Sequence, residues 1–305
     1  MIARTMLLRM ADSKKMEAFV KGSRFSAGTT ARFIAGEDAA AIVAPVRELN
    51  AAGITVSLDF LGESVRTREE VEVTMRTYKS VFETISAQNL KANVSIKLTA
   101  LGLDIDSDFC YHNMCELLDV AGPVQFIRID MESTAYTQIT LDLFYRLWNE
   151  GNYRNVGVVI QAYLRRSAAD VEDLIKNNVR VRLCKGAYKE PAELAFPDKA
   201  DVDANYVALM KRLLSDGNYP GIATHDPAMI AATTAWAKDQ NIPSDRYEFQ
   251  MLYGIRRDLQ NQLVKDGYRM RVYTPFGTHW YPYFMRRLAE RPANLWFVLK
   301  NMLRS

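Results

Sequence analysis

The sequence is poor in cysteine and histidine, with three of each among 305 residues. An odd number of cysteines cannot all pair within one chain, so a disulfide framework is not predicted. Cys110 and Cys115 lack a second pair of ligands nearby, and no two histidines stand four residues apart, so no metal site is predicted either. Free cysteines are typical of a reducing compartment, and we expect a cytoplasmic protein.

Long apolar runs and a large charge imbalance are also absent. No run approaches the length of about 18 apolar residues that a transmembrane helix needs. The 39 lysine and arginine residues against 36 acidic residues leave a net charge of +3, which is too small a surplus to predict nucleic-acid binding. The 15 glycines and 10 prolines are too few for a low-complexity chain. A folded globular protein is therefore expected.

Eight short runs of apolar or β-branched residues, bounded by turn-forming residues, predict β-strands. They span residues 54–59, 92–98, 125–130, 155–161, 179–184, 221–225, 247–252 and 270–273. Each interval between them is long enough for a crossover helix, which parallel strands require. No run is followed by the Gly-x-Gly-x-x-Gly turn of a Rossmann fold, so the pattern favours an α/β fold of the (β/α)8 barrel type over an open doubly wound sheet.

Helix-start signals lie between these runs. Thr67-Arg-Glu-Glu70 is a capping box, and the apolar residues after it recur at spacings of three and four. Ser167 and Asp226 are the expected N-caps of two further helices, the second with Pro227 at its first helical position. These signals predict an alternation of strand and helix along most of the chain.

The two ends of the chain fall outside this alternation. We expect residues 1–53 to form a helical segment packed on the barrel, with helices over 1–21, 29–34 and 38–52. Residues 54–305 are expected to form the barrel domain, which ends in a helix over 295–303. Because the first predicted helix is basic and amphipathic, a peripheral contact with the inner face of the cell membrane is a further hypothesis.

Polar residues gather where the predicted strands end. In a (β/α)8 barrel these ends form the mouth, which carries the functional residues. Any one of them alone is most simply explained as a structural ion pair, but the whole set predicts a site. The set comprises Asp59, Lys97, Asp130, Glu132, Gln161, Arg182, Lys185, Thr224, His225, Glu248, Gln250 and Tyr273. By contrast, His112 and His279 are expected to be surface or loop residues.

Two segments concentrate this polarity. Arg182-Leu-Cys-Lys-Gly-Ala-Tyr188 delivers an arginine, a lysine and a glycine at the end of a strand, which is typical of a turn that binds phosphate. Further on, a single helix face carries Tyr283, Arg286, Arg287 and Glu290. The functional interpretation is a pair of arginines that grips a carboxylate, with Glu290 orienting one of them, and the simpler alternative is a surface salt bridge.

With these motifs the chain resembles the flavin-dependent proline dehydrogenases, in particular their short monofunctional bacterial form. The segment from Arg182 to Tyr188 is similar to the flavin motif on the family's fifth strand. Tyr273-Thr-Pro-Phe-Gly-Thr-His279, together with the arginine-bearing helix face, is similar to its substrate motif. Lys97, Asp130, Gln161 and Thr224-His225 follow the family's order, so the resemblance spans about residues 54–300. Cys184 departs from the aliphatic residue usual at its position.

The resemblance implies a distorted (β/α)8 barrel with bound FAD and assigns a role to each matching residue. Asp130 and Arg182 would be catalytic. The proline site would be lined by Lys97, Tyr273, Tyr283, Arg286 and Arg287, with Glu290 behind an arginine. FAD would be contacted by Met131, Gln161, Lys185, Gly186, Ala187, Thr224 and His225. The size of Tyr273 would favour proline over its hydroxylated form.

The activity implied is oxidation of L-proline to 1-pyrroline-5-carboxylate. A hydride would pass from the ring carbon beside nitrogen to flavin N5, and the electrons would go on to a quinone-type acceptor. Proline must first lose its ammonium proton, so activity is expected to rise with pH on the alkaline side. Two other functions fit the residues alone. A Schiff-base aldolase would use Lys97 or Lys185 as nucleophile, and a non-catalytic barrel would bind a carboxylate ligand or a protein through its arginine face.

Overall fold

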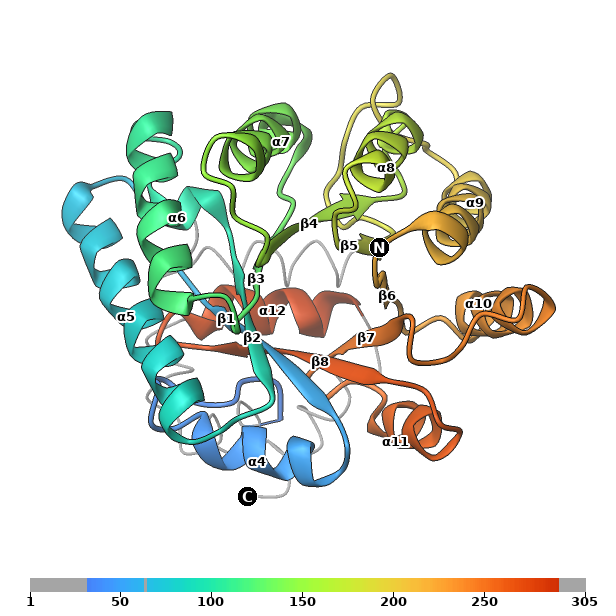
Figure 1. The fold of residues 1–305 in the computed structure, drawn as a ribbon, viewed down its shortest axis with the longest axis horizontal. Helices are drawn as coiled ribbons and strands as arrows, with labels where there is room; N and C mark the ends of the chain where they lie inside the picture. Colours follow the sequence, from blue (N-terminus) through green and yellow to red (C-terminus); the bar gives the residue numbers. More distant parts are fainter. Residues whose placement is uncertain (1–31, 63–64, 291–305) are drawn as a thin grey trace.

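The fold is a closed barrel of eight parallel strands surrounded by helices (Figure 1). The structure, a computed structural model, describes residues 32–62 and 65–290. Its strands are β1 (Thr55–Phe60), β2 (Ala92–Ile96), β3 (Ile127–Ile129), β4 (Val156–Gln161), β5 (Val181–Cys184), β6 (Gly221–Ala223), β7 (Glu248–Leu252) and β8 (Met270–Phe276). Its helices are α4 (Val43–Ala51), α5 (Arg68–Ala87), α6 (Ser107–Ala121), α7 (Thr134–Asn149), α8 (Ser167–Lys176), α9 (Lys199–Asp216), α10 (Pro227–Asp239), α11 (Arg257–Lys265) and α12 (Trp280–Glu290), with a 3-10 helix η1 (Leu98–Leu101) after β2. The predicted α/β barrel is confirmed, and each predicted strand overlaps an observed one.

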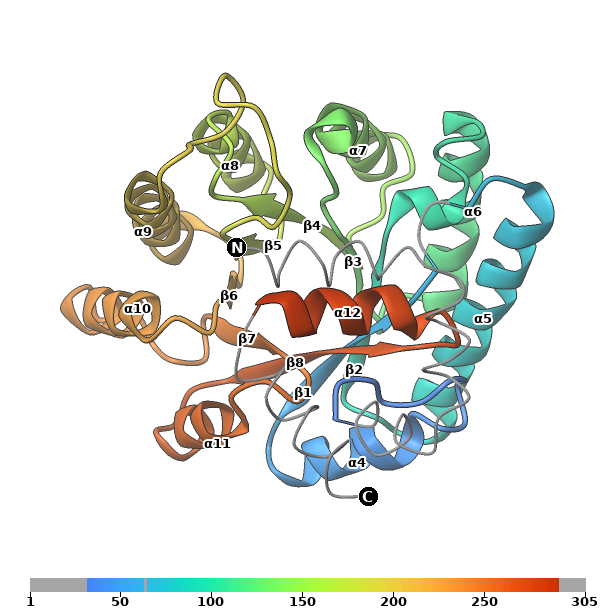
Figure 2. The same ribbon diagram turned by 180° about the vertical axis from the view of Figure 1, so that it is seen from behind.

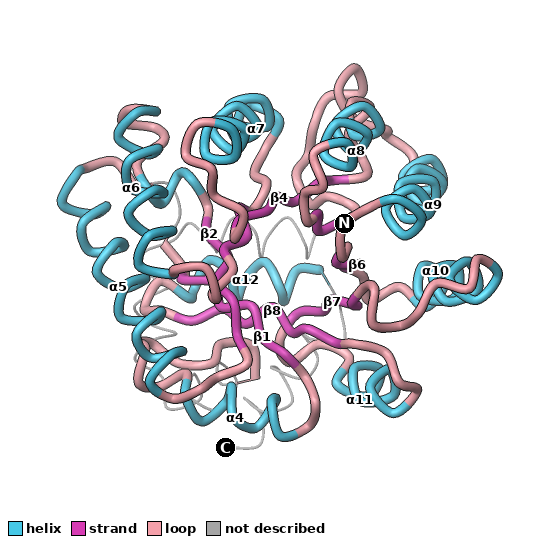
Figure 3. Tube along the Cα trace, in the orientation of Figure 1, coloured by secondary structure: helices cyan, strands magenta, loops and turns pink. Residues whose placement is uncertain are grey.

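β1 closes the barrel by pairing with β2 on one side and with β8 on the other (Figure 3). The pairing with β8 runs from Thr55 opposite Arg271 to Phe60 opposite Phe276. Closure leaves none of these eight strands at an edge with unpaired backbone groups. Because all eight strands are parallel, their carboxyl ends lie at the same end of the barrel, which carries the functional loops in this fold.

Helix α5 shows how the sequence sets the start and the buried face of an outer helix. The Glu70 N–H donates to Thr67 Oγ1 at 3.2 Å, and the Thr67 N–H donates to Glu70 Oε2 at 3.2 Å. These two bonds confirm the predicted capping box. Val71, Tyr78 and Phe82, which recur at helical spacing, are all buried.

The two other predicted helix starts had different outcomes. α10 begins with Pro227, and the Asp226 side chain accepts a backbone N–H of the first turn, as predicted. The prediction for Ser167 was wrong, because this residue is the first of α8 and the N-cap position is Arg166. Ser167 Oγ instead donates to the Gln161 carbonyl oxygen at 2.6 Å. The Ser167 hydroxyl therefore forms a hydrogen bond with the end of β4 instead of capping α8.

The segment before the barrel is less helical than the sequence predicts. Residues 32–34, the described part of the predicted helix over 29–34, form no helix, and α4 begins at Val43 rather than at residue 38. A backbone contact with β8 competes with the helix. The Ala35 N–H donates to the Pro275 carbonyl oxygen at 3.0 Å, and the Gly277 N–H donates to the Gly36 carbonyl oxygen at 2.9 Å. The predicted helices over 1–21 and 295–303 lie outside the described residues, and the domain division at residue 53 stays a prediction.

α12 lies across the end of the barrel at which the strands finish (Figure 2). It packs with Phe33 and Ile34 of the N-terminal segment and with Leu61 after β1, in an apolar cluster separate from the main core. The rings of Phe284 in α12 and Phe33 meet edge to face, with centroids 6.0 Å apart. The N-terminal segment and α12 therefore support each other beside the mouth of the barrel.

The inside of the barrel is polar, whereas the outside of its strands is apolar. In β1, Val56 and Leu58 belong to the main hydrophobic core, while the alternate residues Ser57 and Asp59 are buried without belonging to it. Successive side chains point to opposite faces of a strand, so this second set faces the interior. Barrels of this fold are ordinarily filled with branched apolar side chains, and a polar interior is therefore a candidate site.

Over residues 32–62 and 65–290, no helix is long and apolar enough to cross a membrane. The same residues contain no cluster of three or more His, Cys, Asp or Glu side chains that could hold a metal ion.

Candidate active site

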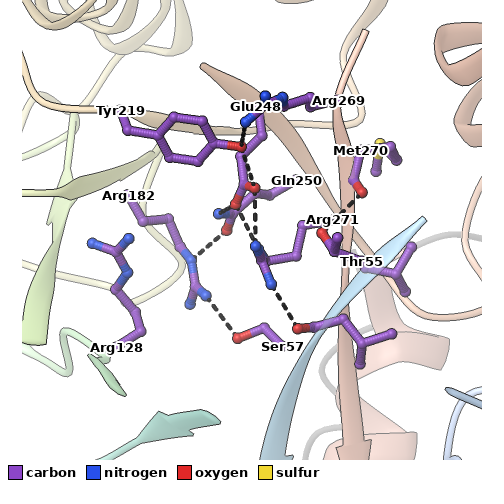
Figure 4. A network of polar contacts seen from close by, with 12 residues as sticks. Thr55, Ser57, Arg128, Arg182, Tyr219, Glu248, Gln250, Arg269, Met270 and Arg271 are labelled. Carbon is purple, nitrogen blue, oxygen red and sulfur yellow. Dashed lines mark hydrogen bonds and ion pairs between the residues drawn. The ribbon is translucent and has the colours of Figure 1, made fainter. Parts of the chain in front are cut away.

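Arg182 on β5 is held by side chains from four other parts of the barrel. Its Nε donates to Gln250 Oε1 on β7 at 2.5 Å, and its Nη2 donates to Ser57 Oγ on β1 at 3.2 Å (Figure 4). Nη2 also donates to Ser95 Oγ on β2 at 3.0 Å, and Nη1 donates to Asp130 Oδ1, just after β3, at 2.6 Å. These strands are not all neighbours, so their side chains meet only because the sheet closes around a common interior.

Asp130 connects Arg182 to Tyr273. The Tyr273 hydroxyl on β8 donates to Asp130 Oδ2 at 2.7 Å, and the Tyr273 ring centroid lies 5.2 Å from the Arg182 guanidinium carbon. Burial raises the pKa of the Tyr273 phenol well above its ordinary value, and the negative charge of Asp130 raises it further. The structure therefore brings three of the predicted site residues into one hydrogen-bonded unit, in which Tyr273 is a protonated donor.

Lys97 forms a second ion pair directly after β2. Its Nζ donates to both carboxylate oxygens of Asp59, at 2.9 and 3.1 Å. Asp59 was recognisable as a polar residue at the end of a strand, but it was not among the residues predicted to bind proline or FAD. An adjacent carboxylate stabilises the ammonium form of lysine. This pairing counts against an aldolase, because a Schiff-base nucleophile must be a neutral amine.

The turn after β5 combines an ion cluster with a glycine at which any side chain would be strained. Lys185 Nζ donates to Asp226 Oδ2 at 2.8 Å and to Asp203 Oδ1 at 2.5 Å. The hydrogen bond from Lys185 lowers the pKa of the Asp226 carboxyl. Gly186 has a φ of +109°, and a Cβ atom there would lie 2.2 Å from the Tyr163 ring. The backbone at this turn is therefore open to close approach only as glycine.

The other residues predicted to contact FAD lie at the ends of consecutive strands. They are Met131 after β3, Gln161 at the end of β4, Ala187 after β5, and Thr224 and His225 after β6. Gln161 Nε2 donates to the Glu132 carbonyl oxygen at 2.8 Å. His225 Nε2 accepts the Leu252 N–H at 2.9 Å, so the neutral ring carries its proton on Nδ1. These positions form a continuous arc around half of the barrel mouth.

The predicted substrate residues of the last helix are described only in part. Tyr283 and Arg287 stand four residues apart in α12, and the Arg287 guanidinium carbon lies 5.2 Å from the Tyr283 ring centroid. Tyr283 is buried. Arg286 and Glu290 are also positions of α12, but their side chains lie outside the described part of the structure.

Glu248 anchors a second polar network, which Gln250 connects to Arg182 (Figure 4). Its Oε1 accepts from Gln250 Nε2 and from Arg271 Nε, each at 2.6 Å. Its Oε2 accepts from Arg271 Nη2 and from the Tyr219 hydroxyl, each at 3.1 Å. Burial alone raises the pKa of Glu248, but the charge and hydrogen bonds of Arg271 outweigh burial, so the pKa is lowered. Glu248 is therefore an ionised, fully bonded carboxylate inside the barrel.

Four members of these networks were not predicted from the sequence. Tyr219 precedes β6, and Ser57, Ser95 and Arg271 alternate with apolar residues in β1, β2 and β8. The alternation was a usable signal, because every second residue of a barrel strand faces the interior. The sequence analysis considered strand ends rather than whole interior faces, and these three residues lie deeper in their strands.

The arrangement presents two fixed cations, each paired with a carboxylate. Arg182 and Lys97 place two cations in a buried interior, and Asp130 and Asp59 hold them in fixed positions. Ion pairs in such an interior are strong and specific only when their hydrogen bonds are satisfied. Arg182 meets that condition with four partners.

Proteins of known identity match this chain over nearly its whole length. A sequence model of the family described as "Proline dehydrogenase" matches residues 42–300. The chain is 44% identical over 305 residues to "Proline dehydrogenase 2" of Bacillus subtilis (strain 168), with 99% of both chains covered. It is 39% identical over 305 residues to "Proline dehydrogenase" of Deinococcus radiodurans, with 99% of this chain and 98% of the relative covered.

Solved structures share the barrel. The chain is similar to proline utilization A (PutA) from Bdellovibrio bacteriovorus, with a TM-score of 0.78 and 30% sequence identity. The similarity covers 86% of this chain and 32% of that PutA chain, so this chain spans about a third of that protein's length. PutA from Bradyrhizobium japonicum gives a TM-score of 0.74 with 25% identity.

Proposed function

The chain belongs to the proline dehydrogenase family, and from that premise we propose that it oxidises L-proline to 1-pyrroline-5-carboxylate with bound FAD. The family assignment made from the sequence is confirmed, and the protein is an oxidoreductase that acts on proline. The observation that carries the finer proposal is the hydrogen-bonded unit of Arg182, Asp130 and Tyr273 at the barrel mouth.

We infer that proline is held between α12 and the barrel interior. Arg286 and Arg287 would grip its carboxylate, with Tyr283 beside the ring and Glu290 orienting an arginine. From the barrel side, Lys97 and Tyr273 would complete the pocket. The position of α12 across the mouth supports this division, because it places the helix opposite the strand ends. Two arginines on one carboxylate would fix where the ring carbon points.

The residues around the turn after β5 fit a flavin dinucleotide. Gly186 leaves backbone accessible where any side chain would collide with Tyr163, and Lys185 supplies positive charge beside it. We propose that both contact FAD, together with Met131, Gln161, Ala187, Thr224 and His225. When bound, the cofactor supplies the acceptor for a hydride from the ring carbon beside nitrogen. Arg182 would add a fixed positive charge that stabilises negative charge developing at the site.

The electron balance of the reaction determines what the protein must do. Proline first gives up its ammonium proton, so that the nitrogen lone pair can form the new C=N bond. The adjacent C–H bond breaks with both electrons leaving to the acceptor, and the resulting iminium loses its N–H proton to give the imine. The chain would bind the neutral amine, exclude water and hold the C–H bond in one orientation.

The test is an absorption spectrum of the purified protein without oxygen, before and after adding proline. A flavin spectrum that bleaches with proline supports both cofactor and reaction. A flavin that proline leaves oxidised would contradict the proposed reaction, and a colourless protein that cannot be reconstituted with FAD would contradict the cofactor.

We also propose that a quinone-type molecule accepts the electrons and that the basic residues 1–21 contact the membrane surface. The charge and amphipathic pattern of those residues supports the second part. Flotation with vesicles that contain anionic lipid tests it. The full chain is expected to float with the vesicles, and the chain without residues 1–21 is expected to remain at the bottom of the gradient. Equal behaviour of the two would remove the proposal.

A further inference from the structure

We propose that Gln250 is a positioning residue for Arg182, and that Glu248 determines which way the Gln250 amide points. The inference rests on the proposed function, because it assigns a catalytic role to Arg182. Gln250 itself lies on β7, below the mouth, and is only 4% exposed. Its side chain bonds to Arg182 and Glu248, while its backbone carbonyl accepts the Thr224 N–H at 3.1 Å.

The orientation of the Gln250 amide follows from the chemistry of its neighbours. An ionised carboxylate only accepts hydrogen bonds, and a guanidinium only donates them. The amide must therefore turn its NH2 group toward Glu248 and its oxygen toward Arg182. The distances agree, with Gln250 Nε2 at 2.6 Å from Glu248 Oε1 and Gln250 Oε1 at 2.5 Å from Arg182 Nε. A flipped amide would place two donors and two acceptors face to face.

Glu248 is itself held in place by hydrogen bonds, so it gives the Gln250 amide a fixed partner. Arg271 binds both of its carboxylate oxygens, and Tyr219 adds a third partner. Its pKa is lowered despite burial, so it remains an acceptor at neutral pH. A charged group with this many partners holds one geometry. Gln250 thus connects an immobile carboxylate to the active-site guanidinium.

The bond to Nε restrains the tilt of the Arg182 guanidinium plane, which the other contacts of Arg182 do not restrain. Asp130 and the two serines bind the terminal Nη atoms, which lie at the far end of the side chain. Gln250 holds the Nε atom, where the plane joins the aliphatic chain. Without it, the plane can tilt while the terminal contacts remain. We therefore expect loss of Gln250 to misplace Arg182 without unfolding the barrel.

The experiment compares Gln250→Met with Gln125→Met, a substitution of an amide that lies before β3. Gln125 Nε2 bonds to the Phe82 carbonyl oxygen at 3.0 Å and to Ser86 Oγ at 2.7 Å, so the control also removes amide hydrogen bonds. For Gln250→Met we expect kcat with proline to fall by about tenfold to hundredfold, with KM changed by less than about threefold. For Gln125→Met we expect kcat to stay within about twofold.

A double-substitution cycle separates positioning from a merely structural role. Arg182→Lys removes the fork that Gln250 holds. If Gln250 acts through Arg182, then adding Gln250→Met to Arg182→Lys should change kcat by less than about twofold. An equal loss of kcat in both backgrounds would overturn the proposal. Should Gln250→Met fold poorly, Glu248→Gln offers a second cycle, because it removes the preference for one amide orientation. It also removes the charge that pairs with Arg271, so the cycle is measured against Arg182→Lys in the same way.

Crystal structures keep the inference separate from the reaction. In Gln250→Met we expect the plane of the Arg182 guanidinium to tilt, while Nη1 keeps its contact with Asp130 Oδ1, which is 2.6 Å in the wild type. Arg182 unmoved in that variant would overturn the proposal whether or not proline is the substrate. If Arg182 is displaced in the variant but the wild type does not oxidise proline, the result supports the positioning role of Gln250 and contradicts the proposed function.

Discussion

At the scale of the residue, burial determines the protonation state of the Tyr273 phenol. Its hydroxyl is bonded to Asp130, and burial raises the pKa of the phenol well above the ordinary value. Because the phenol keeps its proton, it acts as a donor throughout the neutral range. Asp130 uses one carboxylate oxygen for Tyr273 and the other for Arg182. The three side chains therefore hold one another in place.

Tyr273→Phe removes one donor from this unit and leaves the ring. Asp130 Oδ2 then loses a hydrogen bond in a buried site, which costs about 1–3 kcal/mol. We expect kcat/KM for proline to fall by about tenfold and the free energy of unfolding to fall by the stated amount, measured by steady-state kinetics and urea titration. Tyr268→Phe, in a tyrosine packed against Tyr247 and Phe249, is the matched control. Equal activity of the two variants would contradict the role of the Tyr273 hydroxyl.

The lowered pKa of Glu248 predicts how the stability of the fold depends on pH. Its pKa in the folded protein is lowered, so the ionised group stabilises the fold above the unfolded-state pKa of about 4.3. That contribution is lost as the pH falls through the lowered folded-state value. We expect the free energy of unfolding of the wild type to decline more steeply below about pH 4.3 than that of Glu248→Gln. Urea titrations at several pH values measure the two slopes, and parallel slopes would refute the assignment.

At the scale of the element, the start of α5 depends on one side chain. Thr67 accepts the Glu70 N–H at 3.2 Å within a complete capping box. Thr67→Ala should therefore lower the free energy of unfolding by about 1 kcal/mol, measured by thermal or urea unfolding. Thr67→Ser keeps the acceptor and should recover most of the loss. Activity should stay unchanged in both variants, and a loss of kcat in Thr67→Ala would show that α5 reaches the site.

The elements were largely predictable because their signals are local. Alternating apolar residues marked β1, and the capping box marked α5, since each pattern depends only on neighbours in sequence. The errors came where a distant contact intervened. Residues 32–34 do not form the predicted helix, and the residues after them make backbone hydrogen bonds with β8 and the residue that follows it. Ser167 does not form the predicted cap, because its hydroxyl bonds to the end of β4.

The candidate site was predictable to a similar depth. The strand-end positions of Asp130, Arg182 and Tyr273 could be placed together once the barrel was assumed. Alternation along the strands could place Ser57 and Ser95 in the interior, but it does not show which distant side chain an interior serine meets. Their contacts with Arg182 join strands that are far apart in sequence.

At the scale of the whole molecule, turnover should depend on pH through the substrate. Arginines that grip a carboxylate do not remove the ammonium proton of proline, so the reactive amine form becomes more abundant as the pH rises. We expect kcat/KM to increase by up to about tenfold per pH unit from neutral pH toward pH 9. The raised pKa of Tyr273 keeps its donor intact over this range. A flat profile measured in a constant-ionic-strength buffer would contradict this account.

The closure of the barrel also has a consequence in time. Thr55 Oγ1 on β1 donates to the Met270 carbonyl oxygen on β8 across 215 residues of sequence. Contacts between such distant segments form slowly, because the entropy of closing the loop is lost before the contact contributes. Until β8 docks, Arg271 cannot reach Glu248, and the interior charges remain hydrated. The complete set of Arg182 contacts therefore forms only when β1 takes its place in the closed barrel, because Ser57 on β1 is one of the partners.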